Sequence, residues 1–197
     1  GLFGEDNTAN NPDIIIKASY TLSFQFPKLS FLFPDTALYA GEWRILPIGL
    51  SGNAIMNTPT PYEYIEDTEI ISLLKKRSKF DHKGIFGHGL LVAGSYGKMG
   101  AAVLGARAAL RTGIGLLTCH IPGCGYEIMQ ISVPEAMVRV DRSATCITGV
   151  GEYDIFDAIG AGPGLGADRA TSGAFLDLVE KCGKPIVINA DGINILA

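Results

Sequence analysis

The sequence has few charged residues and no excess of positive ones. Charged side chains make up 18% of the 197 residues, and the formal net charge at pH 7 is −4. Without a basic surface, nucleic acid is not an expected partner. Hydrophobic residues, at 47%, instead indicate an ordered globular protein. An acidic total still permits a phosphate ligand, because backbone N–H groups bind anions locally.

Long apolar runs and regular cysteine spacings are also missing. No stretch approaches the roughly 20 apolar residues of a membrane span, so we expect no membrane partner. The four cysteines follow no zinc or disulfide spacing. Cys119 and Cys124 lie on either side of His120, which leaves a metal site as an alternative. We expect no metal ligands here and reduced thiols, as in a cytoplasmic protein.

The sequence offers little support for nucleophilic catalysis. There are three histidines, and no Ser-His-Asp or Cys-His order has supporting context. For His82 and His88 we expect loop or capping roles in preference to catalytic ones.

One stretch has the order strand, glycine turn, helix. The apolar run 90–93 is followed by Gly94, Ser95 and two more glycines, and the alanine-rich segment 101–111 predicts a helix. Such a turn offers backbone N–H groups and a helix N-terminus to an anion. It is not a P-loop, because Met99 stands where Ser or Thr would follow Lys98. Lys98 is a candidate for steering phosphate, and simple solvation is the alternative.

A second glycine cluster follows the strand predicted over 155–161. It contains Gly162, Gly164 and Gly166 and only partly matches the dinucleotide-binding pattern, because Pro163 is unusual inside that pattern. Ligands gather after strands in open α/β folds. Both glycine turns are therefore candidate binding loops, with a purely structural role as the alternative.

The last predicted strand, 185–188, carries Asp191 and Asn194 at its carboxyl end. A carboxylate in that place orients ligand hydroxyls or metal-bound water, and a turn-forming Asp before Gly192 is the alternative. Repeated strand–loop–helix units predict an α/β fold with a mostly parallel sheet and helices on both faces. The further predicted strands are 115–120 and 136–140, and the further helices are 125–131 and 170–182.

The first seventy residues have a different character. Two strand-like runs, 20–26 and 42–49, precede a stretch rich in Ser, Asn, Thr and Pro that predicts a linker. A helix is expected over 66–76. We divide the chain into a first segment at 1–50, a linker at 51–70 and an α/β portion at 71–197.

Four motifs of the sequence are specific in combination. They are HKGIFGHGLLVAGSYGKMGAAVLGARAALRTGIGLLT (82–118), PEAM (134–137), GAGPGLG (160–166) and NADGIN (189–194). Together they resemble the ADP- or ATP-dependent NAD(P)H-hydrate dehydratases of the ribokinase-like superfamily, and the resemblance extends from about Lys75 to the last residue. It implies a three-layer ribokinase-like fold with a mostly parallel central sheet.

The first fifty residues are similar to another domain. They resemble the closing strands of the NAD(P)H-hydrate epimerase domain, which precedes the dehydratase in many bacterial fusions called bifunctional NAD(P)H-hydrate repair enzymes. The epimerase's catalytic segments lie upstream of these strands, so we expect no epimerase activity from this chain. The resembling runs are KASYTLSFQFPKLSFLF and GEWRILPIGL.

The resemblance implies a reaction and a set of binding residues. The family is understood to phosphorylate the C6 hydroxyl of hydrated NAD(P)H from ADP or ATP, with Mg²⁺ expected; phosphate then leaves and the double bond returns. Family members often form tetramers or larger assemblies, which implies a homo-oligomer. The implied substrate-binding residues are Ala102, Gly162, Gly164, Gly166, Gly94, Ser95, Lys98, Asp191 and Asn194.

Two departures from the family pattern affect the expected site. Asn189 stands where the first Asp of the family's D-A-D-A-x-N strand end is usual. The sequence also stops at Ala197, before the family's H-P-G-E and G-T-G-D segments. The second of these supplies the anion-hole amides and the catalytic aspartate for phosphoryl transfer. We therefore expect a domain truncated at its C-terminus that carries half a site.

Two other functions fit the same motifs. One is a ribokinase-like kinase for a vitamin precursor or sugar, which would leave a stable phosphorylated product. The other is a non-catalytic nucleotide-binding or assembly module.

Overall fold

The computed structural model describes residues 1–197, which form two compact units, Gly1–Leu74 and Lys75–Ala197. No helix in either unit is long and apolar enough to cross a membrane. The assignment of an epimerase-like tail to 1–50 remains a prediction.

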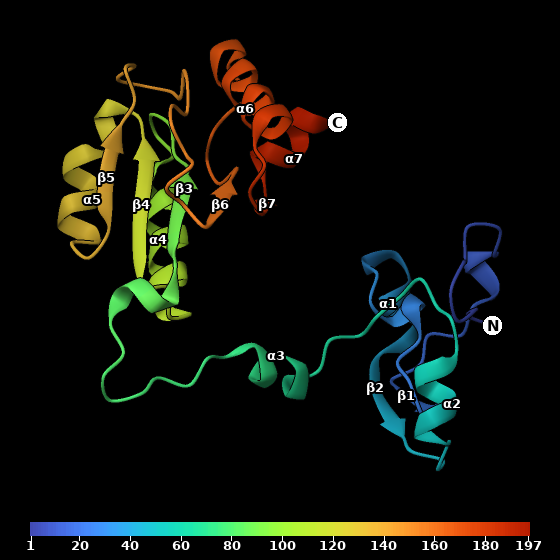
Figure 1. Cartoon of the computed structure of the whole chain (residues 1–197). Coiled ribbons are helices and arrows are strands. Elements are labelled where there is room, and N and C mark those ends of the chain that lie inside the picture. The colour runs from blue at the N-terminus through green and yellow to red at the C-terminus, as the bar shows by residue number, and fades with distance from the viewer. The chain divides into compact units, whose positions relative to one another are not determined.

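The first unit is built on a two-stranded parallel sheet (Figure 1). β1 (Tyr20–Phe24) pairs with β2 (Glu42–Leu46), and helix α1 (Pro34–Ala40) lies between them in sequence. Pro34 is the first residue of α1. Its fixed φ suits the first helical position, where its missing N–H costs no hydrogen bond.

The remaining elements of this unit are short. Helix α2 (Gly52–Asn57) lies inside the stretch predicted as a linker, where no helix was expected. Helix α3 (Asp67–Leu73) ends three residues before the predicted end and begins with a capping box between Glu66 and Glu69. Two short 3₁₀ turns complete the unit, η1 (Pro12–Ile14) and η2 (Leu29–Phe31).

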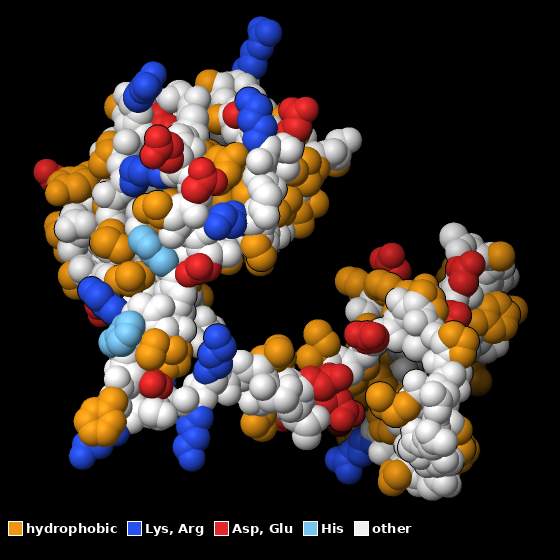
Figure 2. Space-filling model, viewed as in Figure 1, with side chains coloured by type: hydrophobic (Ala, Val, Ile, Leu, Met, Phe, Trp, Pro, Cys, Tyr) orange, Lys and Arg blue, Asp and Glu red, His pale blue; other side chains and the backbone are white.

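Hydrophobic side chains lie on the surface of this unit (Figure 2). Tyr20, Leu22 and Phe24 alternate along β1 and are all exposed, whereas Ser23 between them is buried. β1 thus directs its apolar face away from the small core of its own unit.

The second unit contains a five-stranded, wholly parallel sheet in the order β5-β4-β3-β6-β7 (Figure 1). In the centre, Gly89 of β3 lies opposite Leu117 of β4 and Ala158 of β6. The predicted parallel sheet is confirmed. The strands are β3 (His88–Val92), β4 (Leu116–Ile121), β5 (Met137–Val140), β6 (Ala158–Ala161) and β7 (Ile186–Ile188).

Helices cover both faces of this sheet and make three layers. Leu91 and Ala93 pack with α4 and α5 on one face, whereas Leu90 and Val92 pack with α6 on the other. A strand buried on both faces is a continuous apolar run, as 90–93 is in the sequence. The helices are α4 (Met99–Arg111), α5 (Tyr126–Ser132), α6 (Arg169–Lys181) and α7 (Asp191–Leu196).

Several element boundaries differ from the predicted ones. α7 was not predicted, because glycine and asparagine dominate its first four residues. β6 starts at Ala158 and not at 155, since the Asp157 carboxylate accepts a hydrogen bond from the His88 N–H at 2.8 Å and ends the loop there. Two 3₁₀ turns precede regular elements: η3 (Lys83–Phe86) comes before β3, and η4 (Gly123–Gly125) comes before α5.

Candidate functional site

The strand order reverses at the central strand, and we call the region outside the carboxyl ends of β3 and β6 the crevice. After β3 the chain continues to β4 and β5 on one side, and it then crosses to β6 and β7 on the other side. In open parallel sheets, ligands bind at such a reversal, outside the carboxyl ends of the strands. Both predicted glycine turns leave the sheet here. The first glycine turn (residues 94–98) follows β3, and the second (residues 162–167) follows β6.

Hydrogen bonds join the two glycine turns directly. The Gly94 N–H donates to the Pro163 carbonyl at 2.8 Å. The Ser95 hydroxyl donates to the Gly164 carbonyl at 2.7 Å. Segments separated by 69 positions in the chain thus form one continuous wall.

The Asp191 carboxylate fastens a third segment to this wall. Its Oδ2 accepts the Gly166 N–H at 2.8 Å and lies 3.3 Å from the Lys98 ammonium. The Gly166 N–H lowers the pKa of Asp191 most, and the Lys98 charge lowers it further against the opposing effect of burial. Lys98 and Asp191 keep 52% and 27% of their side-chain surfaces exposed, so a ligand in the crevice can reach both charges.

Two glycines permit the close approach of these segments. A Cβ on Gly162 would lie 1.8 Å from the Asn189 carbonyl oxygen, and one on Gly164 would lie 2.9 Å from the Lys98 carbonyl oxygen. Both residues also have positive φ, +132° and +67°. The turn after β6 can therefore lie against both α4 and the end of β7 because Gly162 and Gly164 have no side chains.

The start of α4 points its backbone N–H groups toward this wall. Lys98 is the N-cap residue and makes no capping hydrogen bond with its side chain. The N-terminus of a thirteen-residue helix carries partial positive charge, which favours an anion. A phosphate group or a polarised hydroxyl is thus a suitable ligand chemistry.

The other two predicted residues lie at the margins of the wall. Ala102 is fully buried beneath the first glycine turn, so its methyl group shapes the wall from below. Asn194 is exposed in α7, one helical turn after Asp191. The structure brings the remaining predicted residues together at the crevice: Gly94, Ser95, Lys98, Gly162, Gly164, Gly166 and Asp191. Their binding roles remain predictions.

The described residues do not form a Mg²⁺ site on their own. No group of three or more His, Cys, Asp or Glu side chains is close enough to hold a metal ion. In the crevice, Asp191 is the one carboxylate among the predicted residues, and Lys98 already neutralises it. No step of the chemistry is therefore assigned to a metal held by this chain.

The histidines and the buried cysteine have structural environments. The His82 Nδ1 accepts the Gly84 N–H at 3.2 Å, the capping role expected from the sequence. His88 contacts the Thr118 hydroxyl at 2.9 Å and packs edge-on against Phe156. Burial raises the pKa of Cys119 to about 12, so its thiol stays protonated and is a poor nucleophile.

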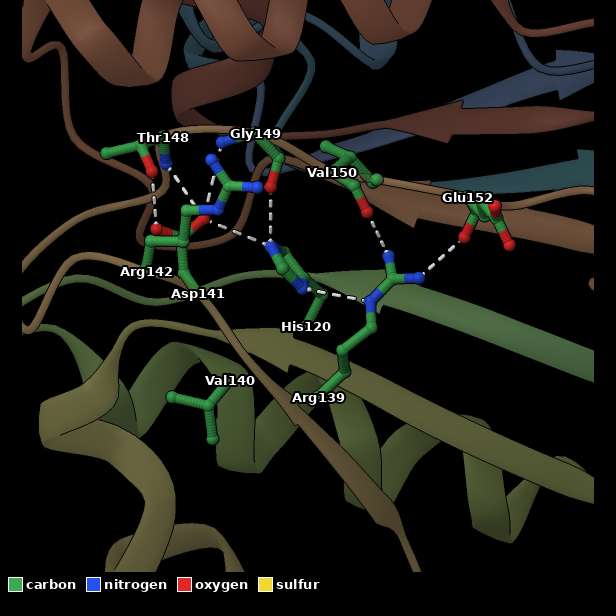
Figure 3. A pocket seen from close by; sticks show the side chains of 10 residues that line it. His120, Arg139, Val140, Asp141, Arg142, Thr148, Gly149, Val150 and Glu152 are labelled. Carbon is green, nitrogen blue, oxygen red and sulfur yellow. Dashed lines mark hydrogen bonds and ion pairs between the residues drawn. The ribbon is translucent and has the colours of Figure 1, made fainter.

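The sequence reasoning missed a buried polar cluster at the ends of β4 and β5 (Figure 3). His120, at 4% exposure, and Asp141, at 7%, line an open hollow of about 610 Å³ together with Arg139. The available signal was Asp141 directly after a strand, followed within eight residues by Ser, Thr and Gly. That composition is typical of a loop wrapped around an aspartate.

The chain is similar in sequence to dehydratases over its second unit and beyond. A family model described as NAD(P)H-hydrate dehydratase matches residues 89–197. The bifunctional NAD(P)H-hydrate repair enzyme of Moorella thermoacetica is 31% identical over 194 residues, which cover 92% of this chain and 36% of that protein. The ADP-dependent (S)-NAD(P)H-hydrate dehydratase of Listeria monocytogenes is 32% identical over 126 residues, covering 63% of this chain and 45% of that one.

Solved structures show the same architecture. The ADP/ATP-dependent NAD(P)H-hydrate dehydratase of Bacillus subtilis, co-crystallised with ATP/Mg²⁺, superposes with a TM-score of 0.54 at 27% identity, over 64% of this chain and 44% of that one. A ribokinase-like superfamily protein of Enterococcus faecalis gives a TM-score of 0.58 at 20% identity, over 71% and 50% of the two chains. The second likeness concerns the fold alone.

These comparisons confirm the ribokinase-like fold expected from the four motifs. The chain spans little more than a third of the length of the bifunctional relatives it matches. The matched residues include both glycine turns and Asp191, the segments that meet at the crevice, and they make up more than half of the chain. The chain therefore belongs to the NAD(P)H-hydrate dehydratase family.

Proposed function

We propose that this chain supplies the substrate-binding wall of a nucleotide-dependent NAD(P)H-hydrate dehydratase. The observation that carries the proposal is the junction of Lys98, Asp191 and Gly166, which joins three strand ends around one accessible pair of charges. Family membership supports the same reaction class.

The chemistry explains why a kinase-like fold suits a dehydration. Hydroxide is a poor leaving group, and phosphate is a good one. Transfer of a phosphoryl group to the C6 hydroxyl of the hydrate, followed by cleavage of the C6–O bond and loss of a proton from the neighbouring carbon, restores the nicotinamide double bond. Phosphoryl transfer itself depends mainly on positioning and on neutralising charge.

The residues of this chain then have distinct roles. The two glycine turns form the wall against which the hydrated ring binds, since Gly162 and Gly164 let these segments pack closely at the strand ends. Lys98 attracts the phosphate that forms on the hydroxyl, because its ammonium is the exposed positive charge at the wall. Asp191 holds Lys98 and the Gly166 amide in place.

ADP or ATP is the proposed phosphoryl donor. The B. subtilis relative was co-crystallised with ATP/Mg²⁺, and the L. monocytogenes relative is named for its ADP dependence. Mg²⁺ would accompany the nucleotide, as in the crystals of the B. subtilis relative. A cytoplasmic location and homo-oligomeric assembly, both expected from the sequence, are further proposals; size-exclusion chromatography with light scattering tests the second.

The direct test uses the full-length protein with hydrated NADH and ADP or ATP. We expect the near-ultraviolet absorbance of reduced nicotinamide to return and one phosphate to be released for each NADH restored. Lys98→Met, which keeps the length of the side chain and removes its charge, should lose most of this activity, whereas Lys98→Arg should retain part of it. Absence of restored absorbance would refute the proposal. A phosphorylated product that persists would instead favour a kinase.

A further inference from the structure

We propose that Asp141 is a positioning residue for the first glycine turn. Asp141 lies outside that turn and would act through the loop 142–149, which its carboxylate organises. This inference rests on the proposed function, because it assigns the first glycine turn to the substrate wall. The described contacts support it in three steps.

The Asp141 carboxylate binds its own loop at several points (Figure 3). Its Oδ1 accepts the Ser143 N–H at 2.8 Å and the Thr148 hydroxyl at 2.6 Å. Its Oδ2 accepts the Thr148 N–H at 2.9 Å and the Gly149 N–H at 3.3 Å. Both carboxylate oxygens are therefore acceptors only, and both ends of the loop are fixed to one buried charge.

His120 and Arg139 hold that charge from the sheet side. The His120 Nε2 lies 3.2 Å from Asp141 Oδ2 and 2.8 Å from the Gly149 carbonyl, while its Nδ1 accepts a hydrogen bond from Arg139 Nε at 3.1 Å. Arg139 also donates to the carbonyls of Val150 and Glu152. The side chains of His120, Arg139 and Asp141 are thus engaged with one another or with backbone carbonyls, which fits a structural anchor better than a ligand site.

The loop 142–149 is hydrogen-bonded in turn to the first glycine turn. The Thr145 carbonyl, midway between the two anchored ends, accepts the Tyr96 N–H at 2.8 Å. The Ser143 and Ala144 carbonyls accept the N–H groups of Gly123 and Cys124, which tie the loop to the end of β4 as well. Tyr96 stands between Ser95 and Lys98 in sequence, so the position of its amide affects both site residues.

Replacement of Asp141 by Asn tests this positioning role with little change in side-chain volume. Because both carboxylate oxygens accept hydrogen bonds, the Asn Nδ2 must face donors in either orientation. We expect the Tyr96 amide to exchange with solvent about tenfold faster or more, as for a lost hydrogen bond. Hydrogen-exchange mass spectrometry of the full-length protein, resolved to the peptide that contains Tyr96, measures this.

The kinetic measurement separates positioning from simple destabilisation. With hydrated NADH, Asp141→Asn should raise KM by about tenfold while kcat changes far less, because a displaced wall weakens binding. Thr148→Val, which removes one hydrogen bond to the same carboxylate, should show a smaller effect in the same direction. Val133→Ala is the control: it removes buried volume on the α5 side of the sheet, and KM should not change.

Each outcome decides one of the two ideas. If the folded Asp141→Asn protein keeps wild-type exchange at Tyr96, the positioning role is wrong. It is equally wrong if exchange accelerates but KM is unchanged, or if Val133→Ala raises KM as much. If Asp141→Asn does not fold, Thr148→Val provides the same comparison. A wild-type protein without dehydratase activity would refute the proposed function, and the Tyr96 exchange would still test the positioning role.

Discussion

The ammonium group of Lys98, at the start of α4, lies 3.3 Å from the carboxylate of Asp191, at the start of α7, although 93 positions separate the two residues. Both side chains remain partly exposed, so solvent screens their attraction. The pair therefore contributes little to folding, and its more important effect is to fix where a positive charge stands beside the two glycine turns.

Replacing Lys98 by Met should separate activity from stability. We expect the free energy of unfolding to change by about 1 kcal/mol or less, as for an exposed ion pair. By contrast, kcat/KM should fall by about 10²-fold or more, since the role we propose for this charge is to attract the developing phosphate. Denaturant unfolding and steady-state kinetics measure the two quantities. Lys181→Met, which breaks the exposed pair with Asp177, is the control and should leave kcat/KM unchanged.

Replacing Gly164 by Ala should destabilise the second unit. The new Cβ would meet the Lys98 carbonyl oxygen at 2.9 Å, and the backbone has φ +67°. Strain of this kind costs about 1–3 kcal/mol. Gly173→Ala is the matched control, because Gly173 lies inside α6 with open space around it; this change should raise stability by about 0.5–1 kcal/mol. Equal effects of the two substitutions on thermal unfolding would contradict the argument.

His120 should make stability depend on pH. Burial, and then the nearby charge of Arg139, lower the pKa of His120 below its usual 6.5. The unfolded chain therefore binds more protons in this range, so the contribution is complete above pH 6.5 and is lost as the pH falls through the lowered folded pKa.

The pH dependence can be assigned by substitution. In His120→Gln, the decline in the free energy of unfolding that begins near pH 6.5 should be reduced. Asp141, whose pKa is held below 3.8 despite burial by hydrogen bonds from Ser143 and Thr148, loses its contribution only in more acidic solution. If the free energy of unfolding of His120→Gln depends on pH between these two regions as steeply as that of the wild type, the assignment is wrong.

Asn189 should tolerate the aspartate that is usual at this position in the family. Its Oδ1 accepts the N–H of Ala190 at 2.8 Å, and a carboxylate oxygen can accept the same bond. Asn189→Asp should therefore change the free energy of unfolding by no more than about 0.5 kcal/mol. Asn189→Leu, which has no acceptor, is the comparison. A large loss of stability in Asn189→Asp alone would show that the amide group has a specific partner.

The sequence predicted the strands and long helices of the second unit because their patterns are local. Residues 90–93 are apolar throughout, as a strand buried on both faces requires, and α4 and α6 differ from prediction by two residues or fewer at each end. Short elements were harder to predict from the sequence. α2 and α7 have six residues each and a composition typical of turns, so their helical form depends on context.

The candidate site could be predicted only residue by residue. Lys98 and Asp191 were both chosen from the sequence, but nothing in it indicated that they pair. Asp141 was not chosen at all, because its importance lies in five hydrogen bonds to four residues that come together only when the loop closes. Contacts of this kind depend on tertiary structure, and they cannot be predicted from local composition.

The parallel sheet also determines when the crevice can form. β3 must pair with β6, and Ser95 must contact Gly164, 69 positions further along the chain, before the two glycine turns meet. Non-local pairing of this kind is slow, because the cost of closing a long loop precedes the gain from contact. Strands β3, β4 and β5 can pair with one another without β6, but the crevice is absent until β6 has paired with β3. Binding competence therefore depends on the non-local pairing of β3 with β6, and not on the local folding of either glycine turn.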